Sequence, residues 1–462
     1  MVTRTPTTTL NELRRQLSGA VYEPGDAAYA ETCTLFNAMI ERRPAAVARC
    51  ADAGDVAAAI GFTREHGLPL AVRAGGHSVA GLSLVDDGLV IDVRDLSDIA
   101  VDAERRVVRV GAGATWAELD RATHPHGLAT TGGRVSSTGV AGLTLGGGSG
   151  WLERKHGLAC DNLLAVELVT ADGDHVRASA DEHPDLFWAL RGGGGNFGVA
   201  TAFEFRLHPL ESEVLAGLAL YPAERGRELL RLYRDVMRDA PEGLSLAFLY
   251  LTAPAEPDIP EHLHGKLAVA IAGMYAGPVA EGEEALREIR AFGPPEVDFY
   301  APMPYPDFQC MIDDPPGYRN YWTADHLTDL PDDAIEAIAR RSEELPPGPA
   351  QLFIVSWGGA VARASEDDSP LAGREATFVV HPFALWEDPA DDERLIGWAR
   401  AFREDLSAYA TGAVYLNFIG DEGQARVRSG YRAASYERLA RVKATWDPEN
   451  VFRASGNVAP AG

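Results

Sequence analysis

The sequence is poor in cysteine. Its 462 residues include four, Cys33, Cys50, Cys160 and Cys310, which lie far apart and form no C-x-x-C pair. This spacing argues against a zinc cluster and a disulfide framework, so we expect no bound metal. The low number suits a reducing compartment. The N-terminus also lacks an apolar stretch of the about 7–15 residues typical of a secretory signal, so we expect a cytoplasmic protein.

Long hydrophobic runs and excess positive charge are also missing. No window reaches the roughly 18 apolar residues of a membrane-spanning helix, since the best candidate, 267–280, is interrupted by glycines and Pro278. Lys and Arg number 42 against 68 Asp and Glu, which gives a net charge of −26. Such an acidic chain repels nucleic acid and anionic lipid, so we expect neither as a partner.

The glycine-rich segments lack the common nucleotide-binding signatures. The loops 73–78 and 142–150 have no Walker ending and no Rossmann G-x-G-x-x-G setting. Their glycines either mark turns and close packing or let backbone N–H groups converge on a phosphate. A third cluster, 192–195 with Gly198, lies in the same part of the chain. Together the three favour a diphosphate-containing cofactor that lies across several loops.

The pattern of segments predicts two α+β parts. Up to about residue 210, short strands and helices alternate with the glycine loops. Beyond it glycine thins out, and strand-like segments (267–275, 351–361, 376–385) alternate with helical ones (223–237, 332–345, 392–409). We therefore predict a first domain over 1–210, a second α+β domain over 211–410 with an antiparallel sheet covered by helices, and a segment 411–462 that returns to the first domain.

The order of several motifs resembles a known family. The motifs are RAGGHS (73–78), VGAGATWAELD (110–120), GLTLGGGSGWLERKHGLACDNL (142–163), LFWALRGGGGNFGVAT (186–201), YLNF (415–418) and WDPENVF (446–452). In this order they resemble the berberine-bridge-enzyme-like FAD-linked oxidases of the vanillyl-alcohol-oxidase superfamily. The resemblance is close over 45–210 and good over 411–458. It implies an α+β fold, with a PCMH-type FAD-binding module of two subdomains and a substrate domain built on an antiparallel sheet.

The resemblance also implies covalent FAD. In the bicovalent branch of the family, a histidine of the first glycine loop bonds to a flavin methyl group, and a cysteine after the second loop bonds to the same ring edge. His77 and Cys160 match those positions. Cysteine reacts as the thiolate, and Arg154, Lys155 and His156 lie just upstream. The alternatives are a merely hydrogen-bonding histidine and an inert buried cysteine.

Further cofactor contacts are implied by matching positions in the same motifs. Around the diphosphate we expect Arg73, Gly75, Gly76, Ser78 and Gly81. In support of the second loop we expect Gly142, Gly146, Gly147 and Gly150. Near the flavin or its ribityl chain we expect Asn162, Gly198 and Val199. The alternative for Val199 is that it is simply a buried residue of a strand.

Segment 413–418 supplies the first candidate base. Its pattern predicts a strand, and a period of two puts Tyr415 and Asn417 on one face, where they can jointly meet a polar ligand, so we expect Asn417 among the cofactor contacts. In the family that this sequence resembles, the tyrosine faces the flavin and often removes a proton from the substrate. Tyrosine has an ordinary pKa of about 10, so this role needs a nearby cation or dipole to stabilise the phenolate. The alternative is a hydrogen-bonded core tyrosine.

His381 is the second candidate. In the segment 374–381 it occupies a place where plant relatives can hold a glutamate base or a glutamine, so this sequence departs from both. A histidine there can act as a base or bind the substrate.

These features together predict an FAD-dependent oxidoreductase. We expect a base, Tyr415 or His381, to take a proton from a substrate hydroxyl while a hydride passes to the flavin, which oxygen then reoxidises. The expected substrate is a small molecule, either a sugar or oligosaccharide or a secondary metabolite. An oxidative cyclase or dehydrogenase with the same cofactor, a non-catalytic flavin-binding protein and a protein binding another phosphate ligand remain alternatives. The substrate and the oligomeric state are left open.

Overall fold

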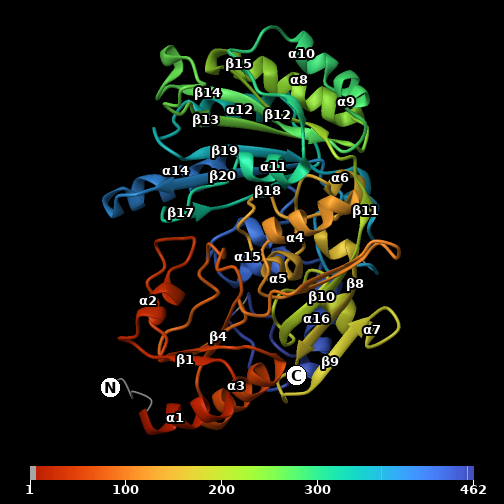
Figure 1. The fold of residues 1–462 in the computed structure, drawn as a ribbon. Coiled ribbons are helices and arrows are strands. Elements are labelled where there is room, and N and C mark those ends of the chain that lie inside the picture. The colour runs from red at the N-terminus through yellow and green to blue at the C-terminus, as the bar shows by residue number, and fades with distance from the viewer. Residues whose placement is uncertain (1–6, 366, 455) are drawn as a thin grey trace.

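The computed structural model describes residues 7–365, 367–454 and 456–462, so the first six residues of the predicted first domain lie outside it. The described chain forms two parts, one above the other in Figure 1. The lower part holds a four-stranded and a five-stranded sheet, and the upper part holds a nine-stranded sheet. No helix of the described residues is long and apolar enough to cross a membrane.

The four-stranded sheet carries the first glycine loop. Its order is β1-β2-β4-β3, with β1 antiparallel to β2 and the other three strands parallel. The bounds are β1 (Ala20–Tyr22), β2 (Ala46–Arg49), β3 (Leu70–Arg73) and β4 (Leu89–Asp92), with helices α1 (Thr7–Gln16), α2 (Ala27–Cys33) and α3 (Ala53–His66). Because β3 ends at Arg73, the loop beginning Ala74-Gly75-Gly76-His77 leaves the sheet at one end.

The five-stranded sheet is antiparallel and carries the second and third glycine clusters. Its order is β5-β6-β10-β8-β9. The bounds are β5 (Ile99–Asp102), β6 (Val107–Gly111), β8 (Leu163–Val169), β9 (His175–Ser179) and β10 (Val199–Arg206), with α4 (Trp116–Thr123), α5 (Val140–Leu145), α6 (Glu153–His156) and α7 (Pro184–Leu190), and a ribbon of β7 (Leu128–Ala129) with β11 (His208–Pro209). Thr115 begins α4 with a capping box to Glu118, which satisfies the free N–H groups of the first turn.

The nine-stranded sheet is antiparallel throughout. Its main order is β15-β12-β14-β13-β19-β20-β17, with β16 on β12 and β18 on β20. The bounds are β12 (Val214–Pro222), β13 (Leu244–Thr252), β14 (Leu267–Tyr275), β15 (Val297–Asp298), β16 (Ala301–Met303), β17 (Arg319–Trp322), β18 (Asp325–Leu327), β19 (Gln351–Ser356) and β20 (Phe378–Trp386). Helices α9 (Val279–Ala285), α10 (Arg287–Ala291), α11 (Tyr305–Met311) and α13 (Gly359–Arg363) connect its strands.

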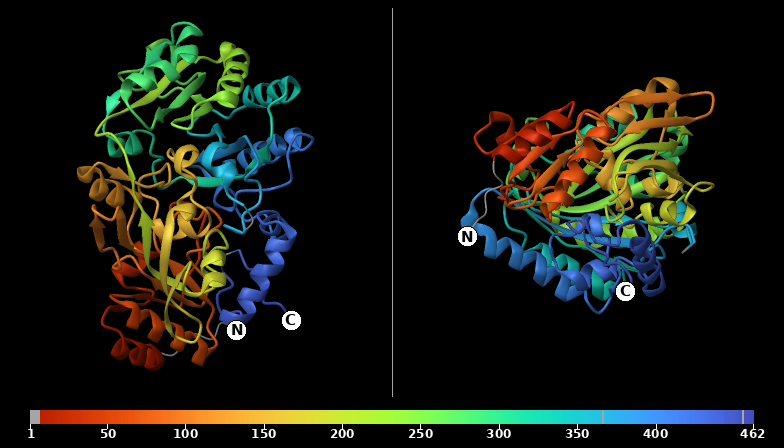
Figure 2. Two further views of the ribbon diagram at one scale, coloured as in Figure 1. Left: turned by 90° about the vertical axis from the view of Figure 1, so that its right-hand side faces the viewer. Right: turned by 90° about the horizontal axis from the view of Figure 1, so that it is seen from below.

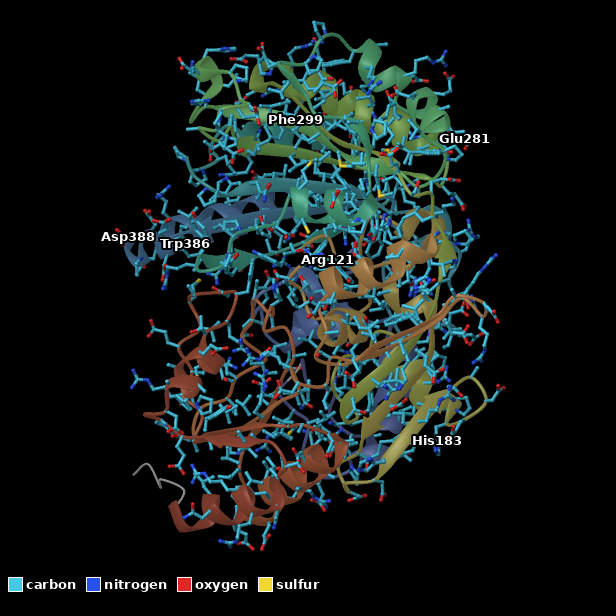
Figure 3. The ribbon with its side chains drawn as sticks, viewed as in Figure 1. Arg121, His183, Glu281, Phe299, Trp386 and Asp388 are labelled. Carbon is cyan, nitrogen blue, oxygen red and sulfur yellow. The ribbon has the colours of Figure 1, made fainter. Side chains whose placement is uncertain are left out.

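The two faces of this sheet have different neighbours. Phe248, Ile354 and Val380 are paired across β13, β19 and β20 and share one buried core with α8 (Gly226–Asp239), α12 (Asp332–Ser342) and α14 (Asp392–Leu406). Since successive side chains of a strand point to opposite faces, the next residues, Phe353 and His381, face away from these helices and toward the lower part. In Figure 3, Arg121 of α4 lies at the boundary between the parts, and it donates to Cys310 of α11 over 3.9 Å.

The C-terminal segment packs against the first glycine-rich part of the chain. α15 (Gln424–Ser429) precedes α16 (Ala433–Trp446), which packs on α7. Figure 2 shows this segment beside the yellow strands and helix of the lower part. Buried Lys443 donates to the carbonyl oxygen of Asn196 at 2.6 Å and pairs with Asp447. These contacts join the end of the chain to the third glycine cluster.

The strand predicted over 413–418 is wrong. Tyr415 is extended, but Leu416–Phe418 is a single 3-10 turn closed by the Phe418 N–H, which donates to the Tyr415 carbonyl oxygen at 3.0 Å. The Asn417 side chain stabilises this turn because it donates to the Leu143 carbonyl oxygen at 2.9 Å. Period two therefore does not set which side chains share a face here.

Candidate active site

A cavity of about 770 Å³ lies between the glycine loops and the nine-stranded sheet. One wall comes from the lower part and contains, among the predicted residues, Gly75, Gly76, His77, Ser78, Gly142, Gly146, Gly198 and Val199. The other wall comes from the sheet and contains Leu249, Gln351, Phe353, His381 and Phe383, with Trp322 beside them. Asn417 and Phe418 of the C-terminal segment also line it.

The glycine wall consists of closely approaching backbones. A Cβ atom on Gly75 would lie 2.3 Å from the backbone nitrogen of Gly139, and one on Gly146 would lie 2.1 Å from Oδ1 of Asn417. Side chains at these positions would push the loops apart. The first glycine loop thus meets the backbone directly before α5, and the second glycine loop meets the side chain of Asn417.

His77 stands on this wall. Its Nε2 lies 3.1 Å from Oγ of Ser137 and its Nδ1 lies 3.4 Å from Oγ1 of Thr138, while the ring stacks on Phe36 at 4.5 Å between centroids. Burial, together with the nearby Arg73 charge, lowers the pKa of His77 to about 4. The imidazole is therefore neutral near pH 7 and keeps a nitrogen lone pair.

The register of the sheet brings the opposite wall together. Phe353 is paired with His381 and Gln351 with Phe383, on adjacent strands β19 and β20. Leu249 is paired with Phe353 from β13, and Trp322 is paired with Phe383 from β17. These side chains alternate along their strands with the core residues under the helices, so they form one mainly aromatic surface.

His381 is held in a defined tautomer on this surface. Its Nδ1 lies 2.8 Å from the Thr323 carbonyl oxygen, which can only accept, so Nδ1 carries the proton. Its Nε2 is buried and has no hydrogen-bond partner among the described residues. The ring stacks on Phe418 at 4.5 Å with an interplanar angle of 2°. Burial lowers the pKa of His381 to about 4, so Nε2 is an acceptor at neutral pH.

Tyr415, the first candidate base, is not among the residues that line the cavity. Its side chain is 1% exposed. Its phenol oxygen accepts from the N–H of Gly148 at 2.7 Å, from the N–H of Ser149 at 2.8 Å and from Nδ2 of Asn417 at 3.0 Å. Tyr415 and Asn417 do meet, although not as strand neighbours. Burial raises the pKa of Tyr415 well above 10, against the lowering effect of these donors.

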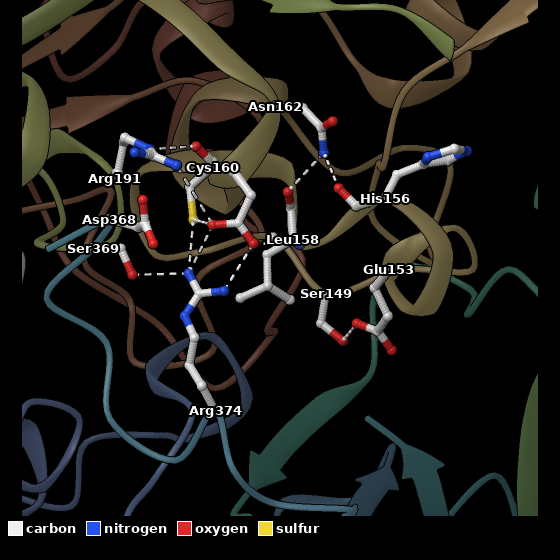
Figure 4. Close-up of polar contacts among 12 residues, drawn as sticks. Ser149, Glu153, His156, Leu158, Cys160, Asn162, Arg191, Asp368, Ser369 and Arg374 are labelled. Atoms are coloured by element: carbon white, nitrogen blue, oxygen red, sulfur yellow. Dashed lines mark hydrogen bonds and ion pairs between the residues drawn. The ribbon is translucent and has the colours of Figure 1, made fainter. Parts of the chain in front are cut away.

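Cys160 lies outside the cavity lining and is fully buried, so the structure does not supply the geometry for its predicted bond to the flavin. Its backbone N–H donates to the Gly147 carbonyl oxygen at 2.8 Å. Figure 4 shows Arg374 directed at its sulfur, with Nη2 and Sγ 3.7 Å apart. Arg374 also pairs with Asp161 at 2.8 Å. Burial raises the pKa of the Cys160 thiol to about 12, which keeps it protonated.

The side chains of the three basic residues just before Cys160 do not face its sulfur. Arg154 donates to the Trp357 carbonyl oxygen at 2.5 Å, and Lys155 donates to the Ala276 carbonyl oxygen at 2.5 Å. His156 stacks on His208 at 3.8 Å between ring centroids. The charge beside the sulfur therefore comes from Arg374, which is 214 residues away in sequence.

The remaining predicted residues lie behind the cavity wall. The Arg73 guanidinium donates to the Thr32 carbonyl oxygen, and burial lowers its pKa to about 10. The Asn162 amide donates to the carbonyl oxygens of His156 and Leu158 at 3.0 and 2.9 Å. Close packing accounts for three glycines, since Cβ atoms would lie 2.7 Å from Ile40 at Gly81, 3.0 Å from Tyr415 at Gly147 and 1.6 Å from the Gly132 oxygen at Gly150.

Several cavity residues were missed by sequence reasoning. Arg134 lines the cavity and is held by Ser149 at 2.8 Å and by the buried carboxylate of Glu153. Asp314, Gln351 and Phe418 line it as well. Gln351 and Phe353 alternate on a strand that was predicted, but the sequence alone gave no sign of which face was buried under helices. Asp314 lies in a proline-rich loop with no periodic pattern.

The residues present fit FAD. The volume lies within the range of about 300–1,000 Å³ that is typical of ligand cavities. The glycines that line one wall carry no side chains, so an anionic group can approach the loop backbone there. His77 presents a neutral imidazole to the same space. In the described residues there is no group of three or more His, Cys, Asp or Glu side chains that could hold a metal.

Comparison with known proteins agrees with this cavity. A family model described as an FAD binding domain matches residues 44–179, and one described as berberine and berberine like matches 414–459. The chain is 31% identical to (R)-6-hydroxynicotine oxidase of Paenarthrobacter nicotinovorans, over 96% of this chain and 98% of that protein. It is 30% identical to an FAD-linked oxidoreductase of Dictyostelium discoideum, over 98% and 97% respectively.

Solved structures share the whole fold. The crystal structure of 6-hydroxy-D-nicotine oxidase from Arthrobacter nicotinovorans superposes with a TM-score of 0.88 at 28% identity, over 96% of this chain and 98% of that one. Xylooligosaccharide oxidase from Myceliophthora thermophila has the same fold, with a TM-score of 0.86 at 21% identity over 98% and 100%. The fold and cavity thus define an FAD-binding enzyme.

The chain belongs to the berberine-like FAD-linked oxidoreductases. The α+β fold predicted from the motifs and the assignment as an FAD-dependent oxidoreductase are confirmed.

Proposed function

We propose that this enzyme oxidises a hydroxyl group of a small molecule, with FAD attached through His77 and with His381 receiving the substrate proton. One observation carries the proposal: the unpartnered Nε2 of His381 belongs to a residue that lines the same cavity as His77 and the glycine loops. When bound, FAD would accept the hydride from the substrate carbon, and dioxygen would be the final acceptor. Sugars and hydroxylated secondary metabolites are the substrate classes proposed.

The residues around the cavity have separate roles. His381 keeps its proton on Nδ1 through Thr323, so Nε2 is free to accept the proton of a substrate hydroxyl. The rings of Phe418, Trp322 and Phe383 surround the His381 imidazole. Arg134 provides a fixed positive charge at the cavity wall, where it is oriented by Ser149 and Glu153. The close approach of Gly75 to Gly139, which directly precedes α5, keeps the His77 loop in place.

Turnover tests the function. The purified protein should show a flavin absorbance band and should release hydrogen peroxide with at least one member of a panel of mono- and oligosaccharides and phenolic alcohols. A flavin-loaded protein whose absorbance is not bleached anaerobically by any alcohol of the panel would favour a non-catalytic flavin-binding protein.

Acid precipitation tests the attachment. In the unmutated protein the flavin should precipitate with the polypeptide, whereas in His77→Ala it should stay in the supernatant, because His77 is the one proposed tether. Cys160→Ala is the matched comparison and should keep flavin in the precipitate with an unchanged absorbance spectrum. The bicovalent arrangement predicted from the sequence requires the opposite result, namely flavin retained by His77→Ala through Cys160.

A further inference from the structure

Asp314 is a cavity carboxylate without a cationic partner. It lies in the loop that follows α11 and lines the cavity. Its Oδ1 accepts from Nε2 of Gln351 at 3.4 Å, and among the described residues no basic side chain acts on it. Its neighbour Asp313 is different, since it accepts from the N–H and Oγ of Ser136 at 2.6 and 2.5 Å. Asp313 thus holds the loop in place, whereas the carboxylate of Asp314 can still accept hydrogen bonds from a ligand.

The surroundings of Asp314 are poor in compensating charge. Burial, with a further contribution from Asp313, raises the pKa of Asp314 to about 7, and no basic group contributes. Arg134, a cation that also lines the cavity, is already paired with Glu153. His381 is neutral. Burial destabilises the ionised form of such a carboxylate. A cation bound beside it would stabilise that form.

Aromatic side chains complete the site. Gln351 lies on the same sheet face as Phe353, and it is paired across the strands with Phe383, which is 4.4 Å from Trp322 between ring centroids. Ring faces attract cations, and the attraction is stronger where water is excluded. One carboxylate beside several rings is a combination that favours a positively charged nitrogen over a neutral hydroxyl.

We propose that Asp314 and Gln351 form a subsite for an ammonium group of the substrate, so that the enzyme acts on amine-bearing hydroxyl compounds. This inference rests on the proposed function, since it assigns the substrate class of the same cavity. The carboxylate of Asp314 accepts N–H donors of the ammonium group, and the Gln351 side-chain oxygen is a second acceptor. The rings of the sheet wall contact the carbon skeleton.

Two probes with one skeleton test the subsite. Tyramine carries an ammonium group where tyrosol, 2-(4-hydroxyphenyl)ethanol, carries a hydroxyl. Isothermal titration of the flavin-loaded protein at pH 8, where Asp314 is ionised, should give at least tenfold tighter binding of tyramine. In Asp314→Asn this ratio should fall to threefold or less, while tyrosol binding stays the same.

Asp421→Asn is the matched control, because Asp421 also lines the cavity but lies in the segment after Phe418. The tyramine preference should survive this change. Equal binding of the two probes to the unmutated protein, no binding of either, or an unchanged ratio in Asp314→Asn would overturn the inference. Failure of the ammonium subsite can be distinguished from failure of the proposed function, because binding is measured without turnover. A protein that prefers tyramine but releases no peroxide would refute only the proposed oxidase activity.

Discussion

Replacing His381 with asparagine is expected to lower kcat/KM by a factor of about 10²–10⁴, the usual contribution of a general base. The asparagine amide nitrogen can replace Nδ1 as donor to the Thr323 carbonyl oxygen, which His381 contacts at 2.8 Å. The variant therefore keeps the buried hydrogen bond and loses Nε2. Steady-state peroxide release, with whichever alcohol the panel identifies, measures the loss, and flavin content and thermal midpoint should stay close to those of the unmutated protein.

The pH profile gives an independent readout of the same residue. The pKa of His381 is lowered to about 4 by burial, and the active form is the neutral imidazole, which exists above that pKa. The contribution of this group to kcat/KM should therefore be level from pH 8 to about 5 and fall as the pH drops through about 4. His381→Asn should lack this limb. Full activity in the variant would exclude His381 as the base.

The glycine-lined half of the cavity was predictable because its signals are local. The motif RAGGHS and the glycines of 142–150 are short segments whose small residues allow a ligand or another backbone to come close. The structure places Gly75, His77 and Gly146 on one wall of the cavity. The other half depends on contacts between distant segments. Phe353 and His381 face the cavity because the helices α8, α12 and α14 cover the opposite face of their sheet, and no local pattern shows which face is covered.

Cys160 and Tyr415 belong to motifs that predict flavin contacts, but neither residue lines the cavity. Cys160 follows the glycine loop closely in sequence, but its turn directs the side chain to Arg374 behind the wall. The family resemblance implies that Tyr415 acts as the base and strand alternation predicts that it shares a face with Asn417, whereas the 3-10 turn at Leu416–Phe418 presents Asn417 and Phe418 to the cavity. In both cases the chemistry of the residue type was plausible, and local backbone geometry decided which way the side chain pointed.

Tyr415→Phe is expected to lower the free energy of unfolding by about 2–6 kcal/mol. The phenol oxygen is the acceptor for the N–H groups of Gly148 and Ser149, which have no other hydrogen-bond partner in the described part of the chain, whereas Asn417 keeps the Leu143 carbonyl oxygen. Each buried donor left unsatisfied costs about 1–3 kcal/mol. Since these donors belong to the second glycine loop, the variant should also retain less flavin. Urea unfolding followed by fluorescence measures the stability.

Tyr305→Phe is the matched control for this change. Tyr305 is 1% exposed like Tyr415, but its hydroxyl has no hydrogen-bond partner among the described residues, so its removal should leave the free energy of unfolding nearly unchanged. A positioning role for Tyr415 further requires that the flavin-loaded fraction of Tyr415→Phe keep the pH limb near 4 that belongs to His381. A catalytic tyrosine would give the reverse pattern: unchanged stability, turnover lowered by a hundredfold or more, and an altered pH profile. The two variants therefore distinguish a residue that holds the glycine loop from one that takes the substrate proton.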